Sequence, residues 1–326
     1  MNPSTVALEV VGGLVLFLFG VLQLSRGIEP LAGERARELL SRFTTNPFAG
    51  VLTGVIATTI LDSSSVTIIL VIALVNGGML TFPQSLGVIM GSNIGTTVSS
   101  QVFAFDLEIY SPLVLLAGFV LFITAGGSSR RRDVGASLLG LGLVFFGLHY
   151  MGEAVRPLRD NDGFMRWMTG LEHPLRGMTT GAIATVIIQS SSAMLGIVIT
   201  LAGQGLITLA GGVAVMLGAE IGTCADTLVA SLGRTRPAVR AGMFHLGFNV
   251  VSVLAGLMLI DQLVALATAL PGGDSIPRQI ANAHVAFNVF GVAAFVWFTP
   301  ALARLLEWLI PDAAEVDGGE PIPNAG

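Results

Sequence analysis

Long apolar stretches separated by short polar turns dominate the pattern along this chain. A helix needs about 20 residues to cross the roughly 30 Å hydrocarbon core of a bilayer. Seven stretches satisfy that length, and they cover residues 7–26, 82–104, 109–126, 134–153, 210–230, 238–260 and 281–306. The pattern predicts an all-α integral membrane protein.

Two further apolar stretches, 47–76 and 174–203, are interrupted near the middle by polar clusters. The clusters read Asp62-Ser-Ser-Ser65 and Gln189-Ser-Ser-Ser192. Each arm, with about 11–15 residues, would be about 16–23 Å long as a helix, which is too short to cross a membrane. We therefore expect two re-entrant helical hairpins, each entering and leaving on one side.

The chain contains an ungapped internal repeat with an offset of 127 residues. Residues 47–65 align with 174–192, and residues 91–96 align with 218–223. Shared hydrophobicity alone does not explain the matching polar, glycine and proline positions, so the pattern indicates a duplicated unit. A weaker similarity joins 245–249 to 284–288, which both read His-x-x-Phe-Asn.

Arginine placement predicts how the two repeats are oriented. If both hairpins re-enter, 11 of the 16 arginines lie on one side and five on the other, as the cytoplasmic excess of basic residues requires. A first hairpin that crossed completely would instead separate Arg130–Arg132 from Arg26 and Arg42. With both hairpins re-entrant, three crossings lie between equivalent points of the repeats. Because that number is odd, we expect the repeats to be inverted.

These patterns predict one transmembrane transport domain over residues 1–311. Repeat 1 covers about 7–126 and repeat 2 about 134–260, and an extra C-terminal span covers about 281–306. Residues 312–326 form a short acidic tail that we expect to be disordered, because it holds few apolar residues to bury.

Composition supports lipid as the main solvent of the chain. Hydrophobic residues make up 53% of it and charged residues 11%, whereas soluble domains carry about 25% charged residues. There are no lysines, and the net charge of −5 gives no nucleic-acid footprint. The single cysteine, Cys224, excludes an internal disulfide.

The two serine clusters are candidate anion-binding tips. Serine hydroxyls both donate and accept hydrogen bonds, and the backbone N–H groups that open each second arm favour an anion. Two tips meeting from opposite sides would make one site with pseudo-two-fold symmetry. A single Ser-Ser-Ser would more often be a packing surface, but duplication at matching positions favours a site.

The stretches 91–97 and 218–223 place glycines on both sides of a polar pair inside apolar spans. Such spacing predicts a broken helix whose carbonyls, with side-chain oxygens, suit a hard cation such as sodium. The alternative is that the small residues only allow close helix crossing. Carboxylates inside the membrane, at Asp62, Glu220 and Asp226, cost about 2.5–3.5 kcal/mol each and so favour function, although Asp226 also fits a structural position near a span end.

The histidines and asparagines of the two His-x-x-Phe-Asn segments have a structural interpretation. His245 and His284 are expected to be satisfied by neighbouring helices rather than to bind a metal. Asn249 and Asn288 are expected to hydrogen-bond between spans.

The paired clusters together resemble the type II sodium–phosphate cotransporter family, and the His-x-x-Phe-Asn segments resemble its bacterial Na+/Pi cotransporter branch. The resemblance covers residues 8–305 and implies sodium as the coupling ion, with no other cofactor. Implied phosphate contacts are Ser63, Ser64, Ser65, Ser190, Ser191, Ser192, Gln189 and Asn93. Implied sodium contacts are Asp62, Gln189, Ser92, Asn93, Thr96, Thr97, Glu220 and Thr223.

Two positions depart from the family pattern. Asp62 replaces the first glutamine of the family motif, and Glu220 stands where repeat 1 has Asn93. Each adds a negative charge near the expected anion, which suggests tighter sodium binding, an additional sodium ion or a protonatable carboxylate.

The leading hypothesis is therefore a multi-pass inner-membrane symporter of inorganic phosphate that works by alternating access. One alternative is a sodium- or proton-coupled carrier of another small anion. Another, of a different class, is a non-transporting scaffold or sensor. We expect no enzyme activity and no nucleic-acid partner; lipid, phosphate and sodium are the expected partners, and a homo-oligomer is compatible with the sequence.

Overall fold

The computed structural model describes residues 3–105, 107–272 and 274–312, and all regular structure within them is helical. The first half contains α1 (Pro3–Phe43), α2 (Pro47–Leu61), α3 (Ser64–Asn76), α4 (Phe82–Phe103), η1 (Glu108–Tyr110), α5 (Ser111–Ile123) and α6 (Ser129–Val155). A connecting region follows with η2 (Arg156–Asp160), α7 (Asp162–Thr169) and η3 (Gly170–Glu172). The second half contains α8 (Pro174–Ile188), α9 (Ser191–Gly203), α10 (Leu209–Gly222), α11 (Cys224–Ser231), α12 (Arg236–Met258), α13 (Ile260–Ala269), α14 (Ile276–Phe295), η4 (Val296–Phe298) and α15 (Thr299–Leu309).

Long apolar helices confirm the expectation of an all-α membrane protein. Among the described residues, five helices are long and apolar enough to cross a bilayer, or six if α4 and α5 count as one bent span. The predicted span 82–104 is not among these five on its own, and the prediction of a separate full span is wrong for the stretch 109–126. There α5 has 13 residues, or about 20 Å of helix, and it meets α4 at a bend of 76°.

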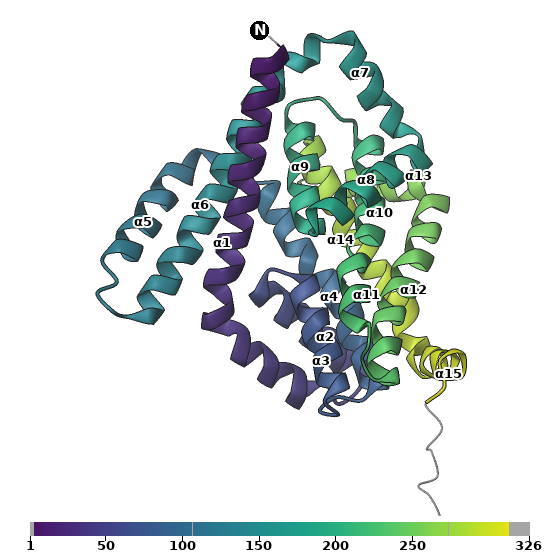
Figure 1. Ribbon diagram of the computed structural model, residues 1–326. Helices are drawn as coiled ribbons and strands as arrows, with labels where there is room; N and C mark the ends of the chain where they lie inside the picture. Colours follow the sequence, from purple (N-terminus) through teal and green to yellow (C-terminus); the bar gives the residue numbers. More distant parts are fainter. Residues whose placement is uncertain (1–2, 106, 273, 313–326) are drawn as a thin grey trace, which may run out of the picture.

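Several helices run beyond the predicted spans. The first helix, α1, has 41 residues and continues past the predicted end at residue 26, through Pro30, to Phe43. Figure 1 shows it bending before it reaches α2, with α5 and α6 lying beside its straight part and α12 and α13 on the opposite side of the molecule. Two short helices, α7 and α13, lie in connections for which the sequence predicted no element.

Glycines let α1 and α6 pack closely along their length. A methyl group added at Gly20 would come within 2.5 Å of the Val144 backbone nitrogen, and one at Gly147 within 2.4 Å of the Phe17 nitrogen. The partner's number falls as the residue number rises, so the two helices are antiparallel. Gly20 and Gly147, and likewise Phe17 and Val144, are equivalent at the offset of 127. The contact is thus symmetric between the two repeats.

Each polar cluster forms a tight turn between two short helices. In the first turn Asp62 ends α2 with a φ of 52°, and Ser63 caps α3. In the second turn Gln189 ends α8 with a φ of 60°, and Ser190 caps α9. These are the positive-φ non-glycine residues of the described chain, and this strained conformation occurs at equivalent positions of the two repeats.

The glycines in the stretches 91–95 and 218–222 serve close helix packing. A methyl group added at Gly91 would come within 2.0 Å of the Val51 carbonyl oxygen, and one at Gly218 within 2.0 Å of the Met178 carbonyl oxygen. The predicted broken helix is wrong for repeat 1, because α4 is continuous through this region. In repeat 2 the only interruption is Thr223, between α10 and α11, and it keeps helical dihedral angles.

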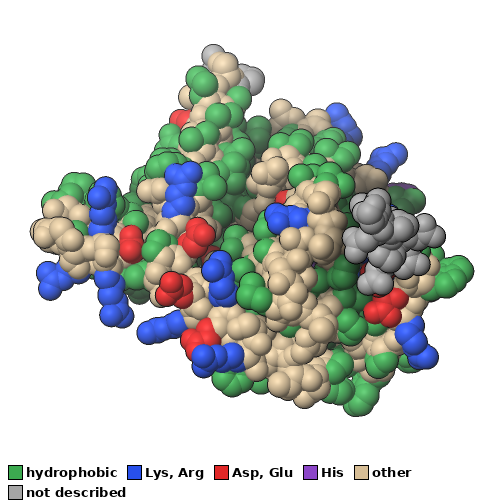
Figure 2. Space-filling model, turned by 60° about the horizontal axis from the view of Figure 1, so that its bottom comes forward, with side chains coloured by type: hydrophobic (Ala, Val, Ile, Leu, Met, Phe, Trp, Pro, Cys, Tyr) green, Lys and Arg blue, Asp and Glu red, His purple; other side chains and the backbone are tan. Residues whose placement is uncertain are grey.

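The core includes most of α4 and α10, whereas the outer helices expose apolar side chains. Leu86 and Ile89 on α4, and Leu217 on α10, are fully buried. On α5, by contrast, Leu113 is 65% exposed, as expected of a helix that faces lipid. Figure 2 shows arginine and acidic side chains spread over the face that lies at the bottom of Figure 1.

Replacement of Gly91 by alanine tests the packing of α2 on α4. The added methyl group has no room beside the Val51 carbonyl, and overpacking costs about 1–3 kcal/mol, so we expect a clear drop in the thermal unfolding temperature of the purified protein. The matched control is Gly12→Ala on α1, where the nearest atom would lie 3.7 Å away and no comparable drop is expected. Equal effects of both changes would contradict this packing role.

Candidate functional site

The first hairpin tip is held by side-chain hydrogen bonds at both ends of the turn. Ser99 on α4 donates a hydrogen bond to the Asp62 carboxylate. The Ser63 hydroxyl accepts from the Val66 backbone N–H at 3.2 Å and so caps α3. Ser64, the first residue of α3, is buried. The tip therefore combines a carboxylate, serine hydroxyls and a helix N-terminus.

The second tip repeats this arrangement with an amide in place of the carboxylate. Ser190 accepts from the Ala193 backbone N–H at 3.1 Å and caps α9, and Ser191 is buried. Gln189 occupies the position of Asp62. Backbone N–H groups at the first turn of a helix have no partner within the helix and favour an anion. Both tips thus offer the same anion-binding groups.

Asp226 on α11 connects the two tips. Ser65 of the first tip lies close to the Asp226 carboxylate, since α3 packs on α11. Asp226 also lines a cavity of about 300 Å³ together with Gln189 of the second tip and Thr223. The second arm of each hairpin contacts both repeats, because α3 packs on α4 and α11 and α9 packs on α10 and α4. The structure therefore brings the two predicted tips to one carboxylate.

The hydroxyls predicted on α4 are engaged within that helix. Ser92 donates to the Ile89 carbonyl at 2.7 Å, Thr96 to the Ser92 carbonyl at 3.0 Å, and Thr97 to the Ile94 carbonyl at 2.7 Å. Their oxygen lone pairs remain available as acceptors. All three side chains are buried.

Asn93 and Glu220 are bonded to the last long helices instead of to the serine tips. The Asn93 amide donates to Asn249 Oδ1 on α12 at 2.8 Å. Glu220 Oε1 accepts from Asn288 Nδ2 at 3.0 Å and lies 2.7 Å from His284 Nε2, both on α14. The expectation that the two asparagines bond between spans is confirmed.

Both histidines lie in the same buried network. His284 Nδ1 is 2.6 Å from the Ser100 hydroxyl of α4, and His245 Nδ1 is 2.8 Å from the Thr227 hydroxyl of α11. The expectation that neighbouring helices satisfy them is confirmed. Ser100 and Thr227 are equivalent at the offset of 127, as Asn93 and Glu220 are. Each His-x-x-x-Asn pair therefore contacts one polar helix of each repeat.

Sequence reasoning missed three residues that contact this site: Ser99 holds Asp62, and Ser100 and Thr227 hold the histidines. It singled out Asp226 as a carboxylate inside the membrane but did not place it beside Ser65. The repeat offset was the available signal, because it pairs Ser99 with Asp226 and Ser100 with Thr227. Extending the alignment seven residues past Asn93 would have identified them.

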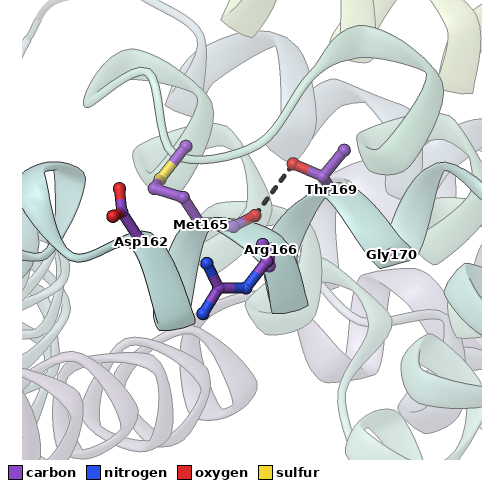
Figure 3. Close-up of a pocket in the computed structure, with 5 residues that line it drawn as sticks. All are labelled: Asp162, Met165, Arg166, Thr169 and Gly170. Carbon is purple, nitrogen blue, oxygen red and sulfur yellow. Dashed lines mark hydrogen bonds between the residues drawn. The ribbon is translucent and has the colours of Figure 1, made fainter.

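The remaining features of the described residues do not add to this site. No group of three or more histidine, cysteine, aspartate or glutamate side chains arranged to hold a metal ion is found within them. A surface hollow of about 430 Å³ lies along α7, and Figure 3 shows that Arg166 points away from Met165 and Thr169 there. That hollow includes none of the predicted site residues.

Replacement of His284 by alanine tests the buried network. His284→Ala would leave the buried Ser100 and Glu220 side chains each without this hydrogen-bond partner, which costs about 1–3 kcal/mol per unsatisfied group, so the change should lower the thermal unfolding temperature strongly. His149 pairs with Glu108 with its side chain 54% exposed, and such surface pairs contribute about 0–1 kcal/mol. His149→Ala is therefore the control, and a loss of stability as large as that of His284→Ala would contradict the role of the network.

Several known proteins are similar to this chain. An uncharacterized protein of Bacillus subtilis, YqeW, is 29% identical over 301 residues, which cover 91% of this chain and 96% of that protein. A "Putative inorganic phosphate export protein YjbB" of Escherichia coli O157:H7 is 26% identical over 313 residues. The match covers 95% of this chain but 57% of YjbB, so the chain spans little more than half of that relative.

A mammalian relative matches over a shorter region. The rat "Sodium-dependent phosphate transport protein 2A" is 31% identical over 97 residues, which are 29% of this chain and 15% of that protein. No solved structure matches this chain. The profile of the family described as "Na+/Pi-cotransporter" matches residues 16–153 and 161–272, which together are most of the chain. The chain is therefore a member of the Na+/Pi-cotransporter family.

Proposed function

We propose that this protein is a sodium-coupled symporter of inorganic phosphate that binds the anion between its two serine tips. The observation that carries the proposal is the position of Asp226, close to Ser65 on the first tip and in one cavity with Gln189 on the second. Membership in the family supports phosphate transport. The names of YjbB and of the rat relative, which refer to phosphate export and sodium-dependent phosphate transport, agree with this solute.

In this proposal the two repeats are inverted and both hairpins are re-entrant. The antiparallel contact of α1 with α6 supports the inversion, because these helices are equivalent at the offset of 127. The arms support re-entry: α2 and α8 have 15 residues each and α3 and α9 have 13 each, or about 23 and 20 Å of helix. Each is shorter than a hydrocarbon core of about 30 Å.

The anion would bind at the starts of α3 and α9. Ser63, Ser64 and Ser65, with Ser190, Ser191 and Ser192, would supply hydroxyls, and the first-turn N–H groups would supply partial positive charge. Gln189 and Asn93 would complete the phosphate contacts. Selectivity for a tetrahedral oxyanion would come from donors on two opposed sides. Phosphate carries about −1.5 to −2 charges at neutral pH, by analogy with phosphoryl groups, and desolvating it alone would be costly.

Sodium ions would neutralise the anion and the nearby carboxylates. The proposed sodium ligands are Asp62, Gln189, Ser92, Asn93, Thr96, Thr97, Glu220 and Thr223. Asp226 would be a further carboxylate close to the anion. Because these acids would repel phosphate unless cations bind first, binding should be cooperative. Sodium entry down a potential of 100 mV would contribute about 2.3 kcal/mol per ion.

Transport would proceed by alternating access in a multi-pass protein of the bacterial inner membrane. Because α3 packs on α4 and α11, and α9 on α10 and α4, each second arm is in contact with both repeats. A rocking motion of one repeat against the other would therefore open one tip to water while the other stays covered. The direction of net flux would follow the sodium and phosphate gradients.

Serine replacements test the anion site. We expect Ser64→Ala and Ser191→Ala to weaken the apparent phosphate affinity about tenfold to hundredfold, because a hydrogen bond to a charged group contributes about 1.5–3 kcal/mol. The measurement is accumulation of radiolabelled phosphate in proteoliposomes with an inward sodium gradient. Ser25→Ala on α1 is the control and should transport normally. Equal effects at all three positions, or no stimulation by sodium, would overturn the proposal; competition by unlabelled anions would reveal a different substrate.

Carboxylate replacements test sodium coupling. Asp62→Asn and Asp226→Asn keep the side-chain shape but remove one negative charge each, so we expect at least about a tenfold rise in the sodium concentration needed for half-maximal transport, equal to about 1.4 kcal/mol. Asp261→Asn changes an exposed residue at the start of α13 and should leave that concentration unchanged. Unchanged sodium dependence in both site variants would argue against these carboxylates as part of the cation site.

A further inference from the structure

An apolar groove lies on the side of the molecule formed by α12, α13 and α14, separate from the serine tips. It has a volume of about 430 Å³. Its apolar walls include Leu259, Leu263, Leu266, Phe287, Phe290 and Phe295. None of the predicted phosphate or sodium contacts lines it.

A buried hydroxyl without a partner faces this groove. Ser252 lines the groove, is 5% exposed, and its Oγ makes no hydrogen bond within the described structure. Serine hydroxyls in apolar helices usually bond back to a carbonyl of their own helix, as those of Ser85 and Ser92 do here. An unmade hydrogen bond in an apolar setting costs about 1–3 kcal/mol. A ligand with an oxygen acceptor would satisfy the Ser252 hydroxyl.

The surroundings of the groove indicate what can reach it. Leu254 and Leu259 are 55% and 54% exposed, and Phe290 is 62% exposed. Leu254 belongs to α12, Phe290 to α14, and Leu259 to the connection that follows α12. Both α12 and α14 belong to helices that are long and apolar enough to cross a membrane. The groove therefore opens onto the apolar surface that faces lipid, where hydrocarbon chains are the surrounding solvent.

We propose that this groove is a binding site for one acyl chain of a membrane phospholipid, whose ester carbonyl accepts a hydrogen bond from Ser252. The lining is apolar except for two polar side chains, Ser252 and Gln262, and an apolar site with a small number of polar groups is typical of one that binds an amphiphile in a fixed orientation. Ser252 lies six residues before the end of α12 at Met258, or about 9 Å along the helix. That position is in the outer part of the hydrocarbon layer, from which the glycerol backbone is within reach.

Two glycines shape the groove: Gly291 leaves space for the chain, and Gly256 leaves space for the Phe287 ring in its wall. At Gly291 an added methyl group would lie 3.5 Å from the Ser252 oxygen, in ordinary contact, so a larger side chain there enters the groove. At Gly256 the Phe287 ring occupies the space that a side chain would need. Phe287 is followed by Asn288, which bonds to Glu220. A bound chain would therefore support the spacing of α12 and α14, which carry the buried histidine and asparagine network.

The test is photolabelling of the whole protein in vesicles. The protein is reconstituted into phosphatidylethanolamine and phosphatidylglycerol containing a small fraction of a phospholipid with a diazirine in one acyl chain, and the labelled residues are mapped by mass spectrometry. We expect labelling to concentrate on the groove residues of α12, α13 and α14. Gly291→Leu should reduce that labelling several-fold by filling the groove. Ser252→Ala should lower retention of the phospholipid during detergent washing about two- to tenfold, the range for a net hydrogen bond.

The control is Gly247→Leu, at an exposed position of α12 where an added methyl group meets no atom within 4 Å. It should leave labelling of the groove unchanged, and all variants should elute and unfold as the parent protein does. Labelling spread evenly over every lipid-facing helix, or unaffected by Gly291→Leu, would overturn the proposal. So would cross-links from these residues to a second copy of the chain in place of lipid.

Discussion

The structure depends on satisfying backbone polar groups where two short helices meet inside an apolar molecule. A turn at membrane depth is tolerated only if protein or water supplies hydrogen-bond partners. Asp62 and Gln189 make that turn in a left-handed conformation, and Ser63 and Ser190 cap the helices that follow. The glycines at 91 and 218 then let the first arms pack directly on α4 and α10. The strained turn, the caps and the close packing occur together in both repeats.

The sequence predicted the parts of this arrangement that a repeat and a length criterion can show. Each interrupted stretch forms two short helices joined by a turn, at Asp62 or at Gln189. Helices of 15 and 13 residues are too short to cross a membrane singly, as the length criterion predicted. The expected break in α4 was wrong because glycines have two uses in membrane helices: they permit a kink, and they permit close approach. Composition cannot separate these uses, whereas the Val51 carbonyl beside Gly91 decides for close approach.

Long-range partners were the part that the sequence did not predict. Nothing local indicates that Ser99 would bond Asp62, or that α14 would place His284 between Ser100 and Glu220. These contacts depend on how the helices pack within and between the repeats, which is a property of the assembled helices. The offset of 127 was nevertheless informative, because it makes Ser99 equivalent to Asp226 and Ser100 equivalent to Thr227.

The two repeats differ at a few polar positions, and these differences decide where the carboxylates lie. Thr58 bonds Thr67 between the arms of the first hairpin, but Met194 stands at the equivalent position in the second, and the Thr185 hydroxyl is left buried without a partner. More consequentially, carboxylates occupy opposite members of equivalent pairs: Asp62 faces Ser99 in repeat 1, whereas Gln189 shares its cavity with Asp226 in repeat 2. Each tip therefore has one carboxylate beside it, supplied by the hairpin in one repeat and by the packed helix in the other. In the proposed anion site, with an acid on each side, bound cations would be needed before the anion could bind, and this would be the electrostatic basis for coupling.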